Sequence, residues 1–286
     1  MKRMIFHVWM SVFAMFFIAR AGADEISATN EVLAGIFIHS ETHTNPPERF
    51  WVAVVDLKNP KLKLRVSRGG ADPDGDGKWK TTLMEPTKIA DRENFDLVIN
   101  GDYFIARGVN DGEGSNSMYR ASQWARPEGP AMTDGLAWSV TTNARPCLVV
   151  HTNGAVTFEM VTQPDGDDFQ VVGGWPILLH DGKIIPVDSK RNTARHPRTV
   201  VGLDATHEKL TLLLLDGRKP GIAAGMTYEE LAAEMLRLGC TEALNLDGGG
   251  SSVMAYRKVG KMCILNAPTD GHERAVADVL GITVEN

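Results

Sequence analysis

The stretch Asn245-Leu246-Asp247-Gly248-Gly249-Gly250-Ser251-Ser252 decides how the rest of the chain is interpreted. Apolar runs at 243–246 and 253–256 lie on either side of it, and each is typical of a short buried strand. Three successive glycines cost backbone entropy, so packing alone does not account for them. They let the backbone come close to another group, or present N–H groups to an anion. We therefore expect a functional site at Asp247; the alternative is a tight bulged turn capped by the aspartate and the serines.

Two further carboxylates directly follow predicted strands. The run 95–99 ends in Asn100-Gly101-Asp102, and the run 210–215 ends in Asp216-Gly217-Arg218. A buried strand holds the residue at its end rigidly, and a pair of such carboxylates suits glycosyl chemistry. Asp102 and Asp247 are therefore candidates for acid, base or nucleophile. Asp216 either takes one of these roles or orients an arginine.

Strand signals outnumber helix signals along the chain. Thr152-Asn153-Gly154 and Asp181-Gly182 separate apolar runs and predict hairpins. One helix is predicted over 82–94, and a second begins at a capping box of Thr227 and Glu230. The prediction is an α+β fold with a mixed, largely antiparallel sheet, few helices and a single main catalytic domain.

Length and charge agree with one globular domain. The chain has 286 residues, of which 43% are hydrophobic, enough for a sizeable core. A net charge of -6 gives no sign of a surface for nucleic acid or acidic membranes.

The N-terminus has the pattern of a secretory signal peptide. Lys2 and Arg3 precede a mostly apolar run at 8–18, and Ala21-Gly22-Ala23 forms an A-x-A site. The run is short for a membrane span, although an uncleaved anchor is the alternative. We expect residues 1–23 to be removed and residues 24–286 to form a secreted or periplasmic domain, which an intact-mass measurement tests.

Metal, disulfide and serine-hydrolase chemistry have little support. Asp72, Asp74 and Asp76 resemble the start of a calcium loop, but the twelfth position is Leu83, so a solvated turn is favoured over calcium. The sequence has no H-x-H, H-E-x-x-H or G-x-S-x-G motif, so no catalytic metal is predicted. The cysteines are expected to be small buried apolar residues, with a Cys240–Cys263 disulfide as the alternative; they are Cys147, Cys240 and Cys263.

Six motifs, in this order, resemble the phosphodiester glycosidase family. They are NGDYF (100–104), GGWPILLHDGK (173–183), RHPRTVVGL (195–203), LLLLDGR (212–218), GMTYEELA (225–232) and NLDGGGSSVM (245–254). The resemblance covers roughly residue 50 to the C-terminus. It implies hydrolysis of a sugar-1-phosphodiester, which frees the sugar and leaves a phosphomonoester.

The residues themselves suit an anionic sugar substrate. Arg198 and Arg218 offer guanidinium forks for phosphate oxygens, although an ion pair with Asp216 or Asp247 is the structural alternative. A phosphate leaving group needs little protonation, so arginine replaces much of a general acid. The other predicted substrate contacts hydrogen-bond sugar hydroxyls, fix the carboxylates or, in the case of the histidine, position the substrate: Asn100, Thr199, Asn245, Gly249, Ser251, Ser252 and His196.

Two other classes of protein remain open on this sequence. One is a carbohydrate-binding or envelope-polysaccharide protein that has the same cleft without turnover, which convergence of Asp102, Arg198 and Asp247 would argue against. The other is a calcium-dependent surface module built on residues 72–76, which metal analysis of the purified protein would test.

Overall fold

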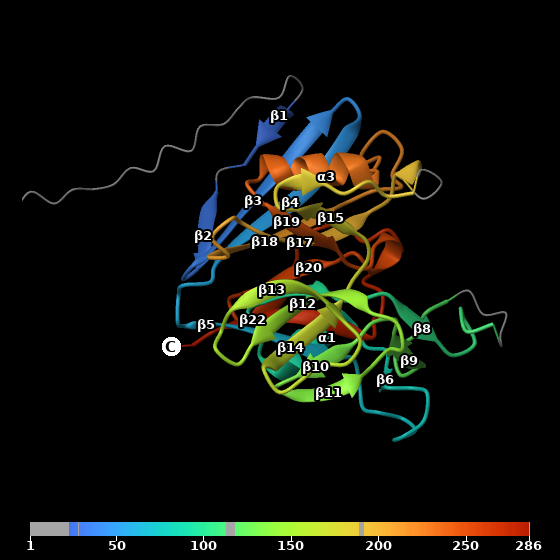
Figure 1. The fold of residues 1–286 in the computed structure, drawn as a ribbon. Coiled ribbons are helices and arrows are strands. Elements are labelled where there is room, and N and C mark those ends of the chain that lie inside the picture. The colour runs from blue at the N-terminus through green and yellow to red at the C-terminus, as the bar shows by residue number, and fades with distance from the viewer. Residues whose placement is uncertain (1–22, 28, 113–117, 189–191, 286) are drawn as a thin grey trace, which may run out of the picture.

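The computed structural model describes residues 23–285 except 28, 113–117 and 189–191 (Figure 1). The predicted signal peptide therefore lies outside the described residues, apart from Ala23. This residue is the first of strand β1 (Ala23–Ile26).

The largest sheet has nine strands and lies under helix α3 (Tyr228–Arg237) in Figure 1. Its order is β1-β3-β4-β18-β17-β19-β15-β16, and β2 pairs with β3. The remaining strands of this sheet are β2 (Asn30–Leu33), β3 (Ile36–Thr44), β4 (Pro47–Asp56), β15 (Ile177–His180), β16 (Lys183–Ile184), β17 (Arg198–Leu203), β18 (Lys209–Leu215) and β19 (Glu242–Asn245).

Three smaller sheets complete the fold. One has the order β21-β20-β7-β22-β5, with β5 (Leu62–Arg68), β7 (Leu97–Asn100), β20 (Met254–Lys258), β21 (Lys261–Ile264) and β22 (Asp278–Val284). The second has the order β11-β10-β14-β12-β13, with β10 (Ala131–Thr133), β11 (Leu136–Ser139), β12 (Arg145–His151), β13 (Val156–Val161) and β14 (Asp168–Gly173). The third joins β6 (Thr81–Thr82), β9 (Trp124–Pro127) and β8 (Phe104–Ala106).

All strand pairs among the described residues are antiparallel, so the prediction of a largely antiparallel fold with few helices is confirmed. The mixed component of that prediction is not found there. Helix α3 connects β18 to β19, but β17 lies between these two strands in the sheet and is antiparallel to both. The architecture is thus mainly β.

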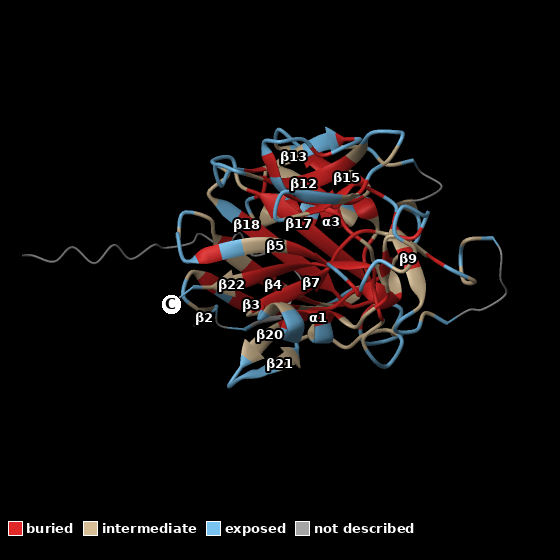
Figure 2. Cartoon of the chain, turned by 90° about the horizontal axis from the view of Figure 1, so that it is seen from below, coloured by how far each residue is buried: buried red, intermediate tan, exposed pale blue. Residues whose placement is uncertain are grey.

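The large sheet separates two hydrophobic cores. Val201 and Leu212 pack into a core shared with the two five-stranded sheets. Their chain neighbours Val200 and Leu213 point the other way and pack under α3. This is the period of two that a strand imposes on its side chains. Figure 2 shows the result, with buried residues along the strands and exposed residues in the loops.

The capping box predicted for the second helix is confirmed, whereas the predicted start of the first helix is wrong. Thr227 Oγ1 accepts the N–H of Glu230, and the Glu230 carboxylate accepts the N–H of Thr227, which completes the capping box of α3. Helix α1 (Pro86–Glu93) begins at its proline, later than predicted, because Thr81–Thr82 pair with β9. Proline is tolerated at this first position.

The hairpin predictions are also confirmed. Strands β12 and β13 pair, and so do β15 and β16, whose turn residues Asp181 and Gly182 have φ of 51° and 70°. Cys147, Cys240 and Cys263 are all free, so the alternative disulfide is absent. The first two are buried, as the favoured interpretation predicted.

Candidate active site

Five of the six motifs quoted above contribute residues to a single pocket of about 300 Å³. Its lining residues are Tyr103, His196, Arg198, Arg218, Tyr228, Asp247, Gly248, Gly249, Gly250 and Arg274. A second pocket, of about 240 Å³, shares Tyr103 and Tyr228 with the first and is also lined by Glu128, Arg145 and Trp175. The two pockets are neighbours because they share these tyrosines, and we refer to them together as the cleft, with the part around Trp175 as its aromatic end.

The end of β7 fixes the backbone of Asp247. Its N–H donates to the Gly101 carbonyl at 3.0 Å, and its carbonyl accepts from Asn100 Nδ2 at 2.7 Å. Asn100 Oδ1 in turn accepts from Thr199 Oγ1 at 2.7 Å and from the Val253 N–H at 3.2 Å. Asn100 and Thr199 are fully buried. They therefore hold the strand ends together behind the pocket and do not line it.

Asn245 fixes the residues at the aromatic end of the cleft by hydrogen bonds. Its Nδ2 donates to the Tyr103 hydroxyl at 2.8 Å and to the Trp175 carbonyl at 2.7 Å. The Trp175 N–H donates back to the Asn245 carbonyl at 2.7 Å. This buried side chain thereby places both aromatic residues at the cleft.

The glycines allow arginine side chains to pack directly on the loop. Gly249 has a φ of +64°, and a Cβ there would lie 3.1 Å from Arg218 Nη1. A Cβ on Gly250 would collide with the guanidinium of Arg274. The close approach predicted from the glycines is thus made by two of the protein's own cations, which surround the Asp247 loop.

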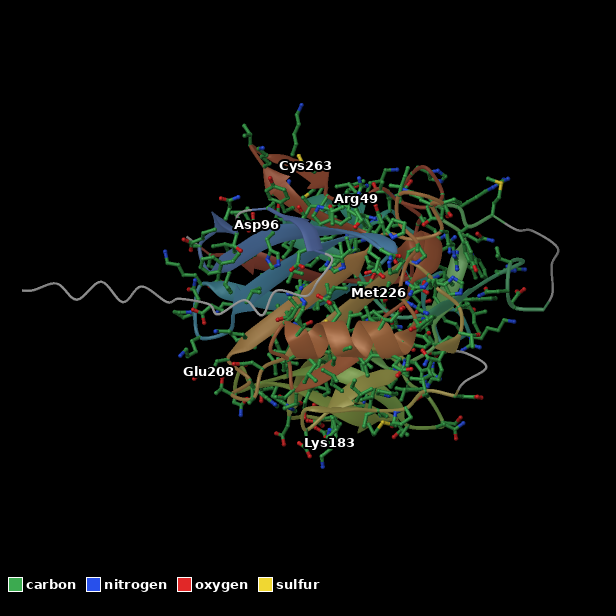
Figure 3. All side chains as sticks on the ribbon, turned by 90° about the horizontal axis from the view of Figure 1, so that it is seen from above. Arg49, Asp96, Lys183, Glu208, Met226 and Cys263 are labelled. Carbon is green, nitrogen blue, oxygen red and sulfur yellow. The ribbon has the colours of Figure 1, made fainter. Side chains whose placement is uncertain are left out.

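Three arginines line the pocket, each held differently. The Arg198 guanidinium lies 3.9 Å from the centre of the Tyr228 ring, and its Nε donates at 3.3 Å to the carbonyl of Met226, labelled in Figure 3. Arg218 Nε donates to His196 Nδ1 at 3.1 Å. Arg274 pairs with Asp270 at 2.8 Å. Within the described chain Arg198 and Arg218 form no ion pair with a carboxylate, so their charge faces the pocket.

Burial and charge shift the titration of the pocket residues. Burial raises the pKa of Asp247 to about 6, and the Ser251 hydroxyl, the Gly248 N–H and Arg274 limit that rise. Burial, then Arg218 and Arg198, lower the pKa of His196, so this imidazole is neutral at pH 7. Burial, then the neighbouring arginines, also lower the pKa of Arg218, a sign of concentrated positive charge. Such a set of groups can hold an anion beside a carboxyl group whose pKa is about 6.

Asp102 lies behind the pocket and is not among its lining residues. It is 2% exposed, and its carboxyl group accepts the N–H groups of Tyr103 at 2.7 Å and Gly129 at 2.6 Å. Its own N–H donates to Asp278 Oδ1 at 2.8 Å. Burial raises the pKa of Asp102 to about 7.

Asp216 also points away from the pocket. It accepts from Arg49 at 2.8 Å and from the Ala267 N–H at 3.2 Å, and is 2% exposed. The Ser251 and Ser252 hydroxyls are both buried. The Ser251 hydroxyl is close enough to Asp247 to lower the pKa of that carboxyl group, whereas the Ser252 hydroxyl has no hydrogen-bond partner among the described residues.

Several cleft residues were not identified from the sequence. Three of them are aromatic residues of the motifs quoted above, so their motifs pointed to the site although the residues themselves were not selected: Tyr103, Trp175 and Tyr228. Arg274 carries no motif, because it lies in the loop before β22 and reaches the site only through folding. Glu128 and Arg145, which pair at 3.2 Å at the aromatic end, likewise carried no signal.

A larger pocket of about 720 Å³ lies elsewhere, beside Asp72. Arg65 in this pocket is already paired with Glu93 and Asp134, so it offers less free charge to a ligand. The Asp72 carboxylate accepts the N–H groups of Asp74 and Gly75, as in a solvated turn. Among the described residues the group of potential metal ligands that converges is a different one, namely His180, Asp181 and Glu242.

Comparison with known proteins identifies a family and a relative that matches part of the chain. The family model for phosphodiester glycosidases matches residues 93–283 of the 286. The SPbeta prophage-derived uncharacterized protein YomE of Bacillus subtilis is 37% identical over 106 residues, and the match spans 34% of this chain but only 16% of that protein.

Two solved structures share the fold. One is the catalytic domain of zebrafish N-acetylglucosamine-1-phosphodiester alpha-N-acetylglucosaminidase auto-inhibited by its pro-peptide, with a TM-score of 0.62, 18% identity, and coverage of 92% of this chain and 88% of that one. The other is a hypothetical protein from Synechocystis, with a TM-score of 0.60, 14% identity, and coverage of 93% and 65%. In the part of the chain described here, no helix is long and apolar enough to cross a membrane.

Proposed function

Because the chain belongs to the phosphodiester glycosidase family, we propose that it hydrolyses the bond between a sugar and the phosphate of a phosphodiester. The products are the free sugar and a phosphomonoester. The observation that carries the proposal is one pocket that is lined by Asp247, by the glycines that follow it and by three arginines.

The positive charge of the arginines in the pocket favours an anionic substrate. A phosphodiester carries one negative charge, and the guanidinium groups of Arg198, Arg218 and Arg274 can share its oxygens. A neutral glycoside would leave this desolvated positive charge uncompensated. The aromatic pocket beside it, lined by Tyr103, Trp175 and Tyr228, offers apolar ring faces to a sugar.

Asp247 supplies the ionised carboxylate. It either takes a proton from the attacking water or attacks the anomeric carbon itself. In both cases the carbon–oxygen bond to phosphate breaks and the electron pair leaves on the phosphate. If Asp247 acts as a base, water forms the new bond to the anomeric carbon in the same step. If Asp247 is the nucleophile, its ester with the sugar is cleaved in a second step by water, which frees the carboxylate and provides the hydroxyl of the sugar. The arginines stabilise that leaving anion, so little protonation of the leaving oxygen is needed. Asp102 and Asp216, being buried and paired elsewhere, then act as supports.

Two substitutions test this assignment. Asp247→Asn keeps the shape but removes the charge, so turnover of an N-acetylglucosamine-1-phosphodiester should fall by about a hundredfold or more, with circular dichroism unchanged. This is the substrate class in the zebrafish enzyme's name, and so the first to test. Arg198→Lys loses the planar fork and should impair the phosphodiester more than a neutral aryl glycoside of the same sugar.

Other outcomes would place the site in another pocket, assign the chemistry to another carboxylate or identify a binding protein. Arg68→Lys, in the larger pocket, should leave turnover unchanged; a loss there would move the site to that pocket. Unchanged turnover in Asp247→Asn would make Asp102 or Asp216 the leading carboxylate. Binding of the phosphodiester without release of either product would identify a carbohydrate-binding protein instead of an enzyme.

A further inference from the structure

We propose that His180, Asp181 and Glu242 form a binding site for a divalent transition-metal ion of the zinc class. One ligand atom from each of the three side chains can be chosen so that all lie within 4.8 Å of one another. The site is separate from the cleft. It lies at the opposite end of β19, which runs from Glu242 toward the loop that carries Asp247.

The backbone at this place is fixed by hydrogen bonds between three segments. The Gly182 N–H, in the β15–β16 turn, donates to the Thr241 carbonyl at 2.8 Å. The Thr241 N–H donates to the Leu203 carbonyl at the end of β17, also at 2.8 Å. The turn that carries His180 and Asp181 is therefore attached to the start of β19, where Glu242 lies, and the three ligands are presented from a rigid frame.

The distances suit coordination better than direct hydrogen bonding. His180 Nδ1 lies 3.7 Å from Glu242 Oε1, and the other ring nitrogen, Nε2, lies 3.8 Å from Asp181 Oδ2. Both separations exceed those of a hydrogen bond. Only one ring nitrogen can bind a given ion, and the 3.7 Å between Nδ1 and Glu242 Oε1 is close to the roughly 3.4 Å between two ligand atoms of a tetrahedral ion at about 2.1 Å. A carboxylate oxygen of Asp181 lies within 4.8 Å of the ligand atoms chosen from the other two side chains, so rotation of its side chain is needed to complete the set.

The donor set selects the ion. An imidazole together with two carboxylates suits zinc, nickel or copper, whereas calcium and magnesium prefer oxygen ligands alone. The two carboxylate charges balance a divalent cation. A second imidazole is near the set, since His207 Nε2 lies 3.8 Å from the other oxygen of Glu242.

The position indicates a structural role. From Glu242 to Asp247 the chain advances five residues, about 16 Å at strand spacing. An ion there would not reach the cleft. It would cross-link the β15–β16 turn to β19 and add stability to the edge of the large sheet, in the way that a bound ligand stabilises the folded state.

Zinc binding to the full chain tests the proposal. After chelator treatment and dialysis, isothermal titration with zinc chloride should show one ion per chain, and zinc should raise the Tm. Calcium and magnesium should do neither. His180→Ala and Glu242→Gln should each weaken zinc binding at least about tenfold and abolish the rise in Tm.

Two controls make the test specific. Lys183→Ala truncates the cross-strand neighbour of His180, which Figure 3 labels at the edge of the molecule, and should bind zinc at least as tightly because it removes a cation. His272→Ala removes an exposed histidine elsewhere and should bind like the unaltered chain. Absence of zinc binding, or binding retained in both His180→Ala and Glu242→Gln, would overturn the proposal. Neither readout depends on hydrolase activity.

Discussion

The ionisation of Asp247 depends on opposing influences from its immediate neighbours. Burial raises its pKa, whereas the Ser251 hydroxyl, the Gly248 N–H and the charge of Arg274 lower it, and the result is a pKa of about 6. A base or nucleophile must be ionised to act. The kcat/KM of the proposed hydrolysis should therefore rise with pH through about 6 and level off above it.

Removal of Arg274 should shift the acidic limb of this pH profile, which is the range in which kcat/KM rises with pH. In Arg274→Met, burial is opposed by one fewer cation, so the pKa of Asp247 rises and the limb shifts to higher pH. At neutral pH kcat/KM should also fall about tenfold, from the loss of one charged contact worth roughly 1.5 kcal/mol. The measurement is the pH profile of kcat/KM for both proteins.

His196 is a second titratable group of the pocket, with a pKa lowered by burial and then by Arg218 and Arg198, so it needs a control. His196→Gln should retain the limb of the unaltered chain, because the neutral imidazole only accepts from Arg218. If the acidic limb is lost in His196→Gln and unchanged in Arg274→Met, the titration belongs to His196.

The start of α3 is the element that shapes the aromatic part of the cleft. Tyr228 is its first residue, stands edge-on to Trp175 with ring centres 5.9 Å apart, and carries the Arg198 guanidinium on its face. The capping box at Thr227 fixes where the helix begins, and Arg195 holds Glu230 and Glu48 beside it. A local capping signal thus determines where Tyr228 lies in the cleft.

Removal of the cap should weaken this element measurably. Thr227→Ala removes the oxygen that accepts the Glu230 N–H at 3.2 Å, so the free energy of unfolding should fall by about 1 kcal/mol. Urea denaturation at pH 7 measures this. Thr206→Ala, an exposed turn threonine, should change stability by less than about 0.5 kcal/mol. Equal losses of unfolding free energy in the two variants would show that the Thr227 cap adds no more stability than an exposed turn threonine.

At the scale of the whole molecule, two carboxylates are enclosed among the sheets. Asp278, the first residue of β22, is 0% exposed, and Asp102 lies against it. Burial, then the charge of Asp102, raise the pKa of Asp278 well above its ordinary range. The folded protein therefore retains a proton that the unfolded chain releases near pH 4. The stability linked to that proton is present at low pH and is lost as the pH rises toward the pKa of the folded state.

Asp278→Asn should flatten this dependence without loss of a hydrogen bond. Its Oδ1 accepts the Asp102 N–H, which an asparagine oxygen can replace, while Oδ2 has no partner among the described residues. Between pH 5 and 8 the free energy of unfolding should fall less steeply in the variant, by up to about 1.4 kcal/mol per pH unit. Urea denaturation across this range measures the slope. Asp76→Asn, at an exposed site, should keep the original slope, and an unchanged slope in Asp278→Asn would disprove the linkage.

Much of this protein is determined by sequence over short distances. Alternating apolar residues such as Val200 and Val201 predict strands, Asp181-Gly182 predicts a tight hairpin, and Thr227 with Glu230 predicts the start of α3. Each depends on backbone preferences or hydrogen bonds within a few residues, so the local sequence suffices. The glycines after Asp247 likewise indicate a close approach, although not by which groups.

Only the tertiary structure decided which carboxylate faces the pocket. Asp102, Asp216 and Asp247 share one local pattern, a strand end next to glycine, yet the first is enclosed by Gly129 and the second is paired with Arg49. The direction of each side chain depends on segments far away in the sequence, because they supply its partners and exclude water from it. Arg274 reaches Asp247, and Glu242 reaches His180, by the same kind of long-range packing, which leaves no mark in the residues beside them.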